Sequence, residues 1–258
     1  MSMSLADLKR HLSLPRFNKY RTIASSDAEA LCLYIWNMEL SECLQPSLHM
    51  LEVVLRNSIH AAAIAQFGRH DWFRDPATLA LLPAEVRGLN QARDQIWQAD
   101  GHDTRRIAAG LDPTPPLPAP DRHLAALTLN FWVALFKSPY RRELWSNIPA
   151  TATTPARSNL LPTVFPYATL RERQQYDMRD RLVLIRDFRN RISHHEPIWN
   201  WAKPHKDVPD VVAQYRLILR VLRWISPASV ALLSLVDRFP AAHARGYRHY
   251  LLHISLTP

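Results

Sequence analysis

Proline and glycine divide this chain into long segments that favour helix, separated by irregular stretches. Its 258 residues include 20 prolines and 5 glycines. So few glycines disfavour tight β-hairpins and glycine-rich phosphate-binding loops. The prolines cluster between segments whose apolar residues recur at helical spacing, and no segment shows the alternation typical of a strand. The sequence therefore predicts an all-α fold in a single domain over residues 1–258.

Apolar periodicity and capping residues locate the expected helices. Ser25 or Ser26 is a suitable N-cap for the first helix, Gly68 suits the position after its end, and Pro46 should split or kink it. The expected helices cover about residues 27–67, 83–99, 122–136, 141–145, 169–194, 207–225 and 227–239. The other segments are expected to form an N-terminal arm (1–24), proline-rich irregular loops (110–120 and 149–168) and a basic C-terminal tail (240–258).

The charge balance favours a polyanionic partner. The formal net charge is +9 and the sequence pI is about 9.9, which points to nucleic acid, with an arginine-rich soluble surface as the alternative. Cys32 and Cys43 are expected to be buried free thiols in a reducing cytoplasm. We expect no signal peptide at the N-terminus and no membrane span, since no apolar stretch of about 18 residues occurs.

The most informative motif is residues 189–196, which read Arg-Asn-Arg-Ile-Ser-His-His-Glu. An imidazole can move a proton near neutral pH, and a guanidinium can bind an anionic phosphorus centre. Together these groups can cleave a phosphodiester without a metal ion. Pro197 disfavours helical geometry at Glu196, so the helix that carries the motif should end near His195.

Other segments accompany this motif, and together they resemble a known family. They are Leu-Tyr-Ile-Trp-Asn at 33–37, Leu-Glu-Val-Val-Leu-Arg-Asn at 51–57, Phe-Trp-Val-Ala-Leu-Phe at 131–136 and the ending His-His-Glu-Pro-Ile at 194–198. With these flanks the chain resembles the Abi-like proteins of bacterial abortive-infection systems over about residues 12–224. The Arg-x4-His spacing from Arg189 to His194 is similar to that of HEPN-domain ribonucleases.

This resemblance implies a HEPN-like helical bundle with additional helices and long proline-rich loops, in a homodimer whose motifs face each other. It implies a metal-independent endoribonuclease that acts on RNA as a toxin in phage defence, with Arg189, Asn190 and His194 as catalytic residues and an antitoxin as a candidate partner. Some members of the wider group have lost activity. A non-catalytic RNA- or protein-binding helical module is therefore the alternative, and a structural dimerising subunit is a third.

The side chains themselves support this chemistry. His194 could remove the proton of an RNA 2′-hydroxyl or protonate the leaving 5′-oxygen, which is worth about 10²–10⁴-fold in rate. Arg189 would stabilise the charge of the pentacovalent phosphorane. Asn190 lies four residues before His194 and hence on the same helix face, whereas Arg189 is turned away by about 140°. We expect RNA cleavage that resists EDTA and leaves a 2′,3′-cyclic phosphate and a 5′-hydroxyl.

Residues around the motif have weaker predicted roles. Arg186 and Arg191 are candidate contacts to the RNA backbone or solvated side chains. Trp199 is a candidate for stacking on a base, with core packing as the favoured alternative. His195 and Glu196 either support the site or end the helix.

A second cluster lies on the first helix. Glu52, Arg56 and His60 are spaced by four residues and share a face, with Asn57 adjacent. Glu52, Arg56 and Asn57 could support the site, where Glu52 would hold Arg189 or His194. The alternative is an ion pair between Glu52 and Arg56 on a solvated face.

The sequence predicts neither a metal site nor a cofactor. Neighbouring histidines on a helix point about 100° apart and do not easily share one ion. His-Glu-x-x-His and Cys-x-x-Cys spacings are absent from the sequence. Trp36, Trp132, Trp145 and Trp224 lie in apolar patterns and are expected in the core.

Overall fold

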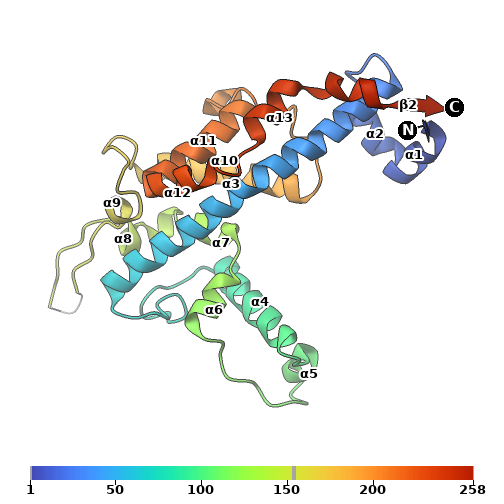
Figure 1. Cartoon of the computed structure of the whole chain (residues 1–258). Coiled ribbons are helices and arrows are strands. Elements are labelled where there is room, and N and C mark those ends of the chain that lie inside the picture. Colours follow the sequence, from blue (N-terminus) through green and yellow to red (C-terminus); the bar gives the residue numbers. More distant parts are fainter. Residues whose placement is uncertain (1, 153–154, 258) are drawn as a thin grey trace. The chain divides into compact units, whose positions relative to one another are not determined.

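Helices account for most of the secondary structure, as the sequence predicts, in a computed structural model that describes residues 2–152 and 155–257 (Figure 1). The chain divides into two compact units: one contains the chain up to Leu51 and from Asp187 onward, and the other runs from Glu52 to Arg186. Helices α3 (Asp27–Phe67) and α10 (Gln175–Ser193) contribute residues to both units. The single domain over residues 1–258 stays a prediction, as does the HEPN-like arrangement of helices.

The first unit contains the beginning of α3, the end of α10 and the elements near both chain ends. Strand β1 (Ser2–Ser4) pairs in parallel with β2 (Ser255–Thr257), and Ser2 is aligned with Ser255. These two short strands were not predicted, because three residues are too few to show alternation. The other elements of this unit are α1 (Leu5–Leu12), α2 (Leu14–Arg21), η2 (Pro204–Lys206), α11 (Val211–Ile225), α12 (Pro227–Leu233), α13 (Phe239–Arg245) and η3 (Tyr247–His253).

The second unit contains the rest of α3 and the first part of α10. Between them lie α4 (Pro83–Ala99), α5 (Thr104–Ala108), α6 (Pro120–Ala125), α7 (Leu129–Ala134), η1 (Ser138–Tyr140), α8 (Arg141–Leu144) and α9 (Leu161–Val164). The bounds of α4 agree with the prediction, and Pro83 occupies its first turn, where a missing N–H has no consequence. The loop before α6 is irregular, as its prolines predict.

Helix α3 is one element of 41 residues. Ser26 caps its start, as predicted, because Ser26 Oγ accepts from the Glu29 amide at 3.2 Å. The Glu29 carboxylate in turn accepts from the Ser25 amide at 2.8 Å, a bond that was not predicted. Gly68 follows the helix with φ of 72°, the left-handed geometry that glycine favours. Pro46 was expected to split or to kink this helix, and it does not split it.

The predicted helix over residues 122–136 is wrong as a single element. Thr128 is extended (φ −79°, ψ 161°) and separates α6 from α7. The sequence prediction placed one apolar stripe on this segment, but Phe131 and the five residues after it are all buried. A break that begins a new helix, in which every residue except Asn130 is buried, satisfies this burial, whereas one amphipathic helix does not.

Other boundaries also differ from the sequence prediction. Helix α10 begins at Gln175 rather than near Thr169, because Thr169 and Glu172 cap each other and close a separate turn (Thr169 N to Glu172 Oε2, 2.8 Å). Helix α11 begins after Asp210, whose carboxylate accepts from the Ala213 amide at 2.7 Å. The helix predicted for 227–239 ends at Leu233. The segments predicted to be an arm, a loop and a tail also contain helices. Residues 1–24 contain α1 and α2, residues 149–168 contain α9, and residues 240–258 contain most of α13 and all of η3.

Each unit has its own buried side chains. In the first unit Phe17, Tyr20 and Leu33 form part of an apolar cluster, and α13 packs beside the N-terminal half of α3, where Trp36 Nε1 donates to the Ala242 carbonyl at 3.0 Å (Figure 1). Trp132 and Trp145 are buried in the second unit and Trp224 in the first, as predicted, whereas Trp36 is half-buried.

Cys32 and Cys43 are buried free thiols on α3, as the sequence predicts. Within the described residues, no helix has both the length and the apolar character needed to span a membrane.

Candidate functional site

The helix that carries the motif ends in a defined hydrogen-bonded turn. Its last regular residue is Ser193, close to the predicted end. The His195 amide donates to the Ile192 carbonyl at 3.0 Å, and the Glu196 amide donates to the Arg191 carbonyl at 2.9 Å. His195 has φ of 56°. These two bonds around a left-handed residue form a Schellman motif, so the backbone at the two histidines has a fixed course.

Asn37 on α3 holds the segment that follows this turn. Its side-chain Oδ1 accepts from the Ile198 amide at 2.6 Å and from the Trp199 amide at 3.4 Å. Asn37 and Ile198 are both buried. A buried amide needs such an acceptor, because an unpaired N–H away from water is costly. The asparagine at 37 therefore positions the end of the motif.

Arg191 and Trp201 complete this anchoring. The Arg191 guanidinium donates to the Pro197 carbonyl and lies over the Trp201 ring, 5.8 Å from its centroid. Trp201 Nε1 donates to the buried Gln214 Oε1 at 3.0 Å, and its ring lies 5.3 Å from that of Phe188. Arg191, a candidate RNA contact in the sequence, thus has an internal role in closing the turn.

The remaining motif residues face solvent to different degrees. His194, His195 and Glu196 are exposed, and Arg189 and Asn190 are half-buried. Among the described residues the Arg189 guanidinium has no hydrogen-bond or ion-pair partner. The motif therefore separates into residues that build the turn and residues whose polar groups are open to a ligand.

The backbone sets the relative directions of the three predicted catalytic residues. The His194 amide still donates to the Asn190 carbonyl at 2.9 Å, so α-helical geometry continues to His194. Asn190 and His194 consequently share a face. Arg189 lies about 140° around the helix from His194, and only its long side chain can bring its charge toward the imidazole.

Glu52, Arg56 and Asn57 lie in the other unit, on the second half of α3. Arg56 donates to Asn57 Oδ1 and to the Ala125 carbonyl, each at 3.3 Å, and the described residues show no ion pair between Glu52 and Arg56. The alternative of a simple ion pair on a solvated face is therefore not realised. A supporting role for these residues stays a prediction.

His60 belongs to a group that could suggest a metal ion. One donor atom each from His60, His70 and Asp121 lie within 4.8 Å of one another. However, His60 Nδ1 accepts a hydrogen bond from Trp72 Nε1 at 3.0 Å. A neutral imidazole has one lone pair, so this bond places the proton on Nε2, the atom that faces Asp121 at 3.9 Å. A metal-bound histidine instead donates from its second nitrogen, so His60 is a poor ligand here.

The two other candidate RNA contacts also have positions in the fold. Arg186 donates to Asn130 Oδ1 at 3.4 Å within the second unit. Trp199 is half-buried and packs against the apolar cluster of the first unit, as the core-packing alternative supposed. Sequence reasoning gave Asn37 no role, although its place in the Leu-Tyr-x-Trp-Asn segment was a signal.

Comparison of the chain with protein-family models, with curated proteins and with solved structures finds no match.

Proposed function

We propose that this protein is a metal-independent endoribonuclease of the HEPN type that acts as a toxin in phage defence. The proposal rests mainly on one observation: His194 is exposed and the Arg189 guanidinium has no partner among the described residues, while Arg191 and Asn37 fix the turn. A catalytic site requires polar side chains that a rigid backbone holds in position and that are not already hydrogen-bonded within the protein. The net charge of +9 favours RNA as the ligand.

In the proposed reaction an RNA 2′-hydroxyl attacks the adjacent phosphorus and the bond to the 5′-oxygen breaks. One His194 accepts the proton of the 2′-hydroxyl, and a second imidazole supplies a proton to the leaving oxygen. Arg189 stabilises the added negative charge of the phosphorane, and Asn190 orients the imidazole that shares its helix face. The products are a 2′,3′-cyclic phosphate and a 5′-hydroxyl.

A second copy of the chain would supply the second imidazole. The angular separation of Arg189 and His194 along α10 makes it difficult for one copy to surround a phosphate alone. A homodimer with facing turns would place two imidazoles and two guanidinium groups around one scissile bond. This arrangement is part of the proposal and follows the resemblance to HEPN ribonucleases.

The test is cleavage of labelled RNA by the purified protein in the presence of EDTA. His194→Ala should lower the rate by about 10²-fold or more, since it removes the general acid–base group. Arg189→Ala should lower the rate by a comparable factor, because charge stabilisation in the transition state is lost. Product ends are identified by their resistance to phosphatase before acid treatment.

His205→Ala and Arg216→Ala are matched controls, because both side chains are exposed in the same unit and lie outside the motif. They should retain the wild-type rate. Equal activity in His194→Ala and His205→Ala would refute the mechanism.

The second candidate function is a non-catalytic RNA- or protein-binding helical module. It uses the same exposed guanidinium and imidazole groups to hold phosphate without transferring a proton. Binding of RNA that weakens steeply with salt, with no cleavage products, would favour it. Toxicity on overexpression separates the two, since it is expected of the ribonuclease alone.

A further inference from the structure

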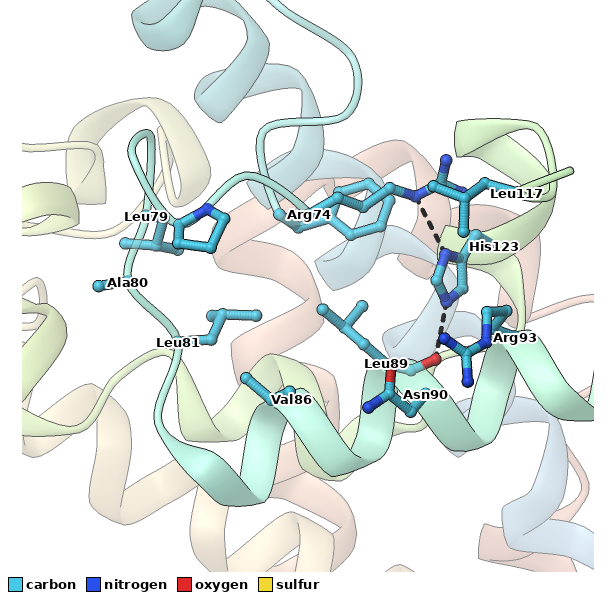
Figure 2. Close-up of a pocket in the computed structure, with 12 residues that line it drawn as sticks. Arg74, Leu79, Ala80, Leu81, Val86, Leu89, Asn90, Arg93, Leu117 and His123 are labelled. Carbon is cyan, nitrogen blue, oxygen red and sulfur yellow. Dashed lines mark hydrogen bonds between the residues drawn. The ribbon is translucent and has the colours of Figure 1, made fainter. Parts of the chain in front are cut away.

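The second unit contains a cavity of about 280 Å³ between the segment after α3, helix α4 and the loop before α6. Apolar side chains form one end, among them Leu79, Leu81 and Val86, while Arg74, His123 and Arg93 gather at the other (Figure 2). Two lining residues are large, apolar and unusually exposed: Val86 at 41% and Leu117 at 60%. A cavity with an apolar end, a basic end and an exposed apolar rim is suited to a small amphipathic ligand.

Arg74 supplies a positive charge that has no direct ion-pair partner among the described residues. Its guanidinium donates to His123 Nδ1 at 3.0 Å and to the carbonyls of Pro118 at 2.7 Å and Ala119 at 3.4 Å. All three acceptors are neutral. The nearby Asp71 is instead bonded to Arg69, at 2.6 and 2.9 Å. Arg74 is half-buried, and burial lowers its pKa, so an anion at this site would offset a desolvated charge.

His123 holds that guanidinium in place. It is buried, and its Nδ1 accepts from Arg74 Nε, so its Nε2 carries the proton and donates to the Leu89 carbonyl at 2.8 Å. Figure 2 draws both bonds as dashed lines. An imidazole that accepts at Nδ1 and donates from Nε2 is neutral. Nε and one terminal nitrogen of Arg74 are thereby occupied, while Nη1 has no bond to the described residues. Nη1 is the donor left for a ligand.

Arg93, at the same end, is different. Its guanidinium donates to Asp94 Oδ1 at 2.8 and 2.9 Å and lies 4.6 Å from the Trp97 ring centroid. Its charge is already paired, so the uncompensated charge of the cavity is that of Arg74.

We propose that this cavity binds a small amphipathic monoanion, namely a carboxylate with an apolar tail of about eight carbons, whose head group accepts from Arg74 and whose tail covers Leu79, Leu81 and Val86. The site lies wholly in the second unit and is independent of the proposed ribonuclease motif. The cavity volume, just below the usual range of about 300–1,000 Å³, limits the ligand to this size.

The test is titration of the full-length protein with octanoate by isothermal calorimetry, with octan-1-ol as the uncharged probe of the same chain length. Octanoate should bind with a stoichiometry of one. A hydrogen bond to a charged group contributes about 1.5–3 kcal/mol, which corresponds to about tenfold or more in affinity. Octanol should therefore bind the wild type at least about tenfold more weakly than octanoate does, and octanoate should bind Arg74→Gln more weakly by a similar factor. Arg105→Gln, an exposed arginine on α5, is the matched control and should bind octanoate as the wild type does.

A second variant keeps the test decisive if Arg74→Gln disturbs folding. Val86→Trp adds a large ring at the exposed rim and leaves the charge in place, whereas Ala99→Trp adds the same ring at the exposed end of α4. The first should abolish octanoate binding and the second should not. Failure of octanoate to bind the wild type, equal affinity for octanol, or full affinity in Val86→Trp would overturn the proposal.

Discussion

Replacing Asn37 by alanine tests whether one buried acceptor fixes the turn that carries the two exposed histidines. The Asn37 side chain, in a residue that is 4% exposed, accepts from the Ile198 amide at 2.6 Å, and Ile198 is 0% exposed. Alanine leaves this amide buried without a partner, which costs about 1–3 kcal/mol. The bond to Trp199 at 3.4 Å is weaker and adds little. We therefore expect a loss of about 2 kcal/mol in the free energy of unfolding.

Urea denaturation followed by tryptophan fluorescence measures this loss, and thermal melting should show a fall in Tm of about 4–8 °C. Asn200→Ala removes an exposed asparagine from the same segment and is expected to change the free energy of unfolding by less than about 0.5 kcal/mol. If Asn37→Ala is no more destabilising than Asn200→Ala, the reasoning that Asn37 anchors the turn is refuted.

Two further predictions concern titratable groups that are buried or half-buried. Burial lowers the pKa of His60 and of His123 below the ordinary value of 6.5, so the unfolded chain binds protons more readily than the folded one below that pH. Stability should be retained above about pH 6.5 and fall on acidification below it; a Tm that does not change between pH 7.5 and 5.5 would contradict this. Burial raises the pKa of Cys32 and Cys43, so both thiols should resist an aromatic disulfide reagent until the protein is unfolded; rapid reaction of the native protein would disprove it.

The sequence correctly predicted several ends of helices that are set by capping residues, glycine or proline. Ser26 caps the start of α3, Gly68 follows its end, and α4 begins at Pro83, the first residue of the predicted range. The division at Thr128 could not be predicted in this way, because it depends on the burial of Phe131 and the five residues after it. The pairing of β1 with β2 joins residues from opposite ends of the chain and leaves no local pattern.

In the candidate site, too, local features could be predicted from the sequence and long-range contacts could not. The end of α10 near His195 followed from Pro197, which is a local effect. The contact between Asn37 and Ile198, residues 161 positions apart, has no signature in spacing. The same holds for Arg74 and His123, which are separated by 49 positions and together form the basic end of a cavity. Such long-range polar contacts become visible only once the fold is known.

The left-handed residue that ends α10 is a histidine, although glycine would occupy that conformation at lower cost. The two hydrogen bonds that close the turn use only backbone atoms and the proline-containing segment beyond it is held by other side chains. The fold therefore does not require an imidazole at position 195. Replacing His195 by glycine would relieve the backbone strain and remove the imidazole. Any activity lost in that variant would therefore measure the contribution of the imidazole to function rather than to stability.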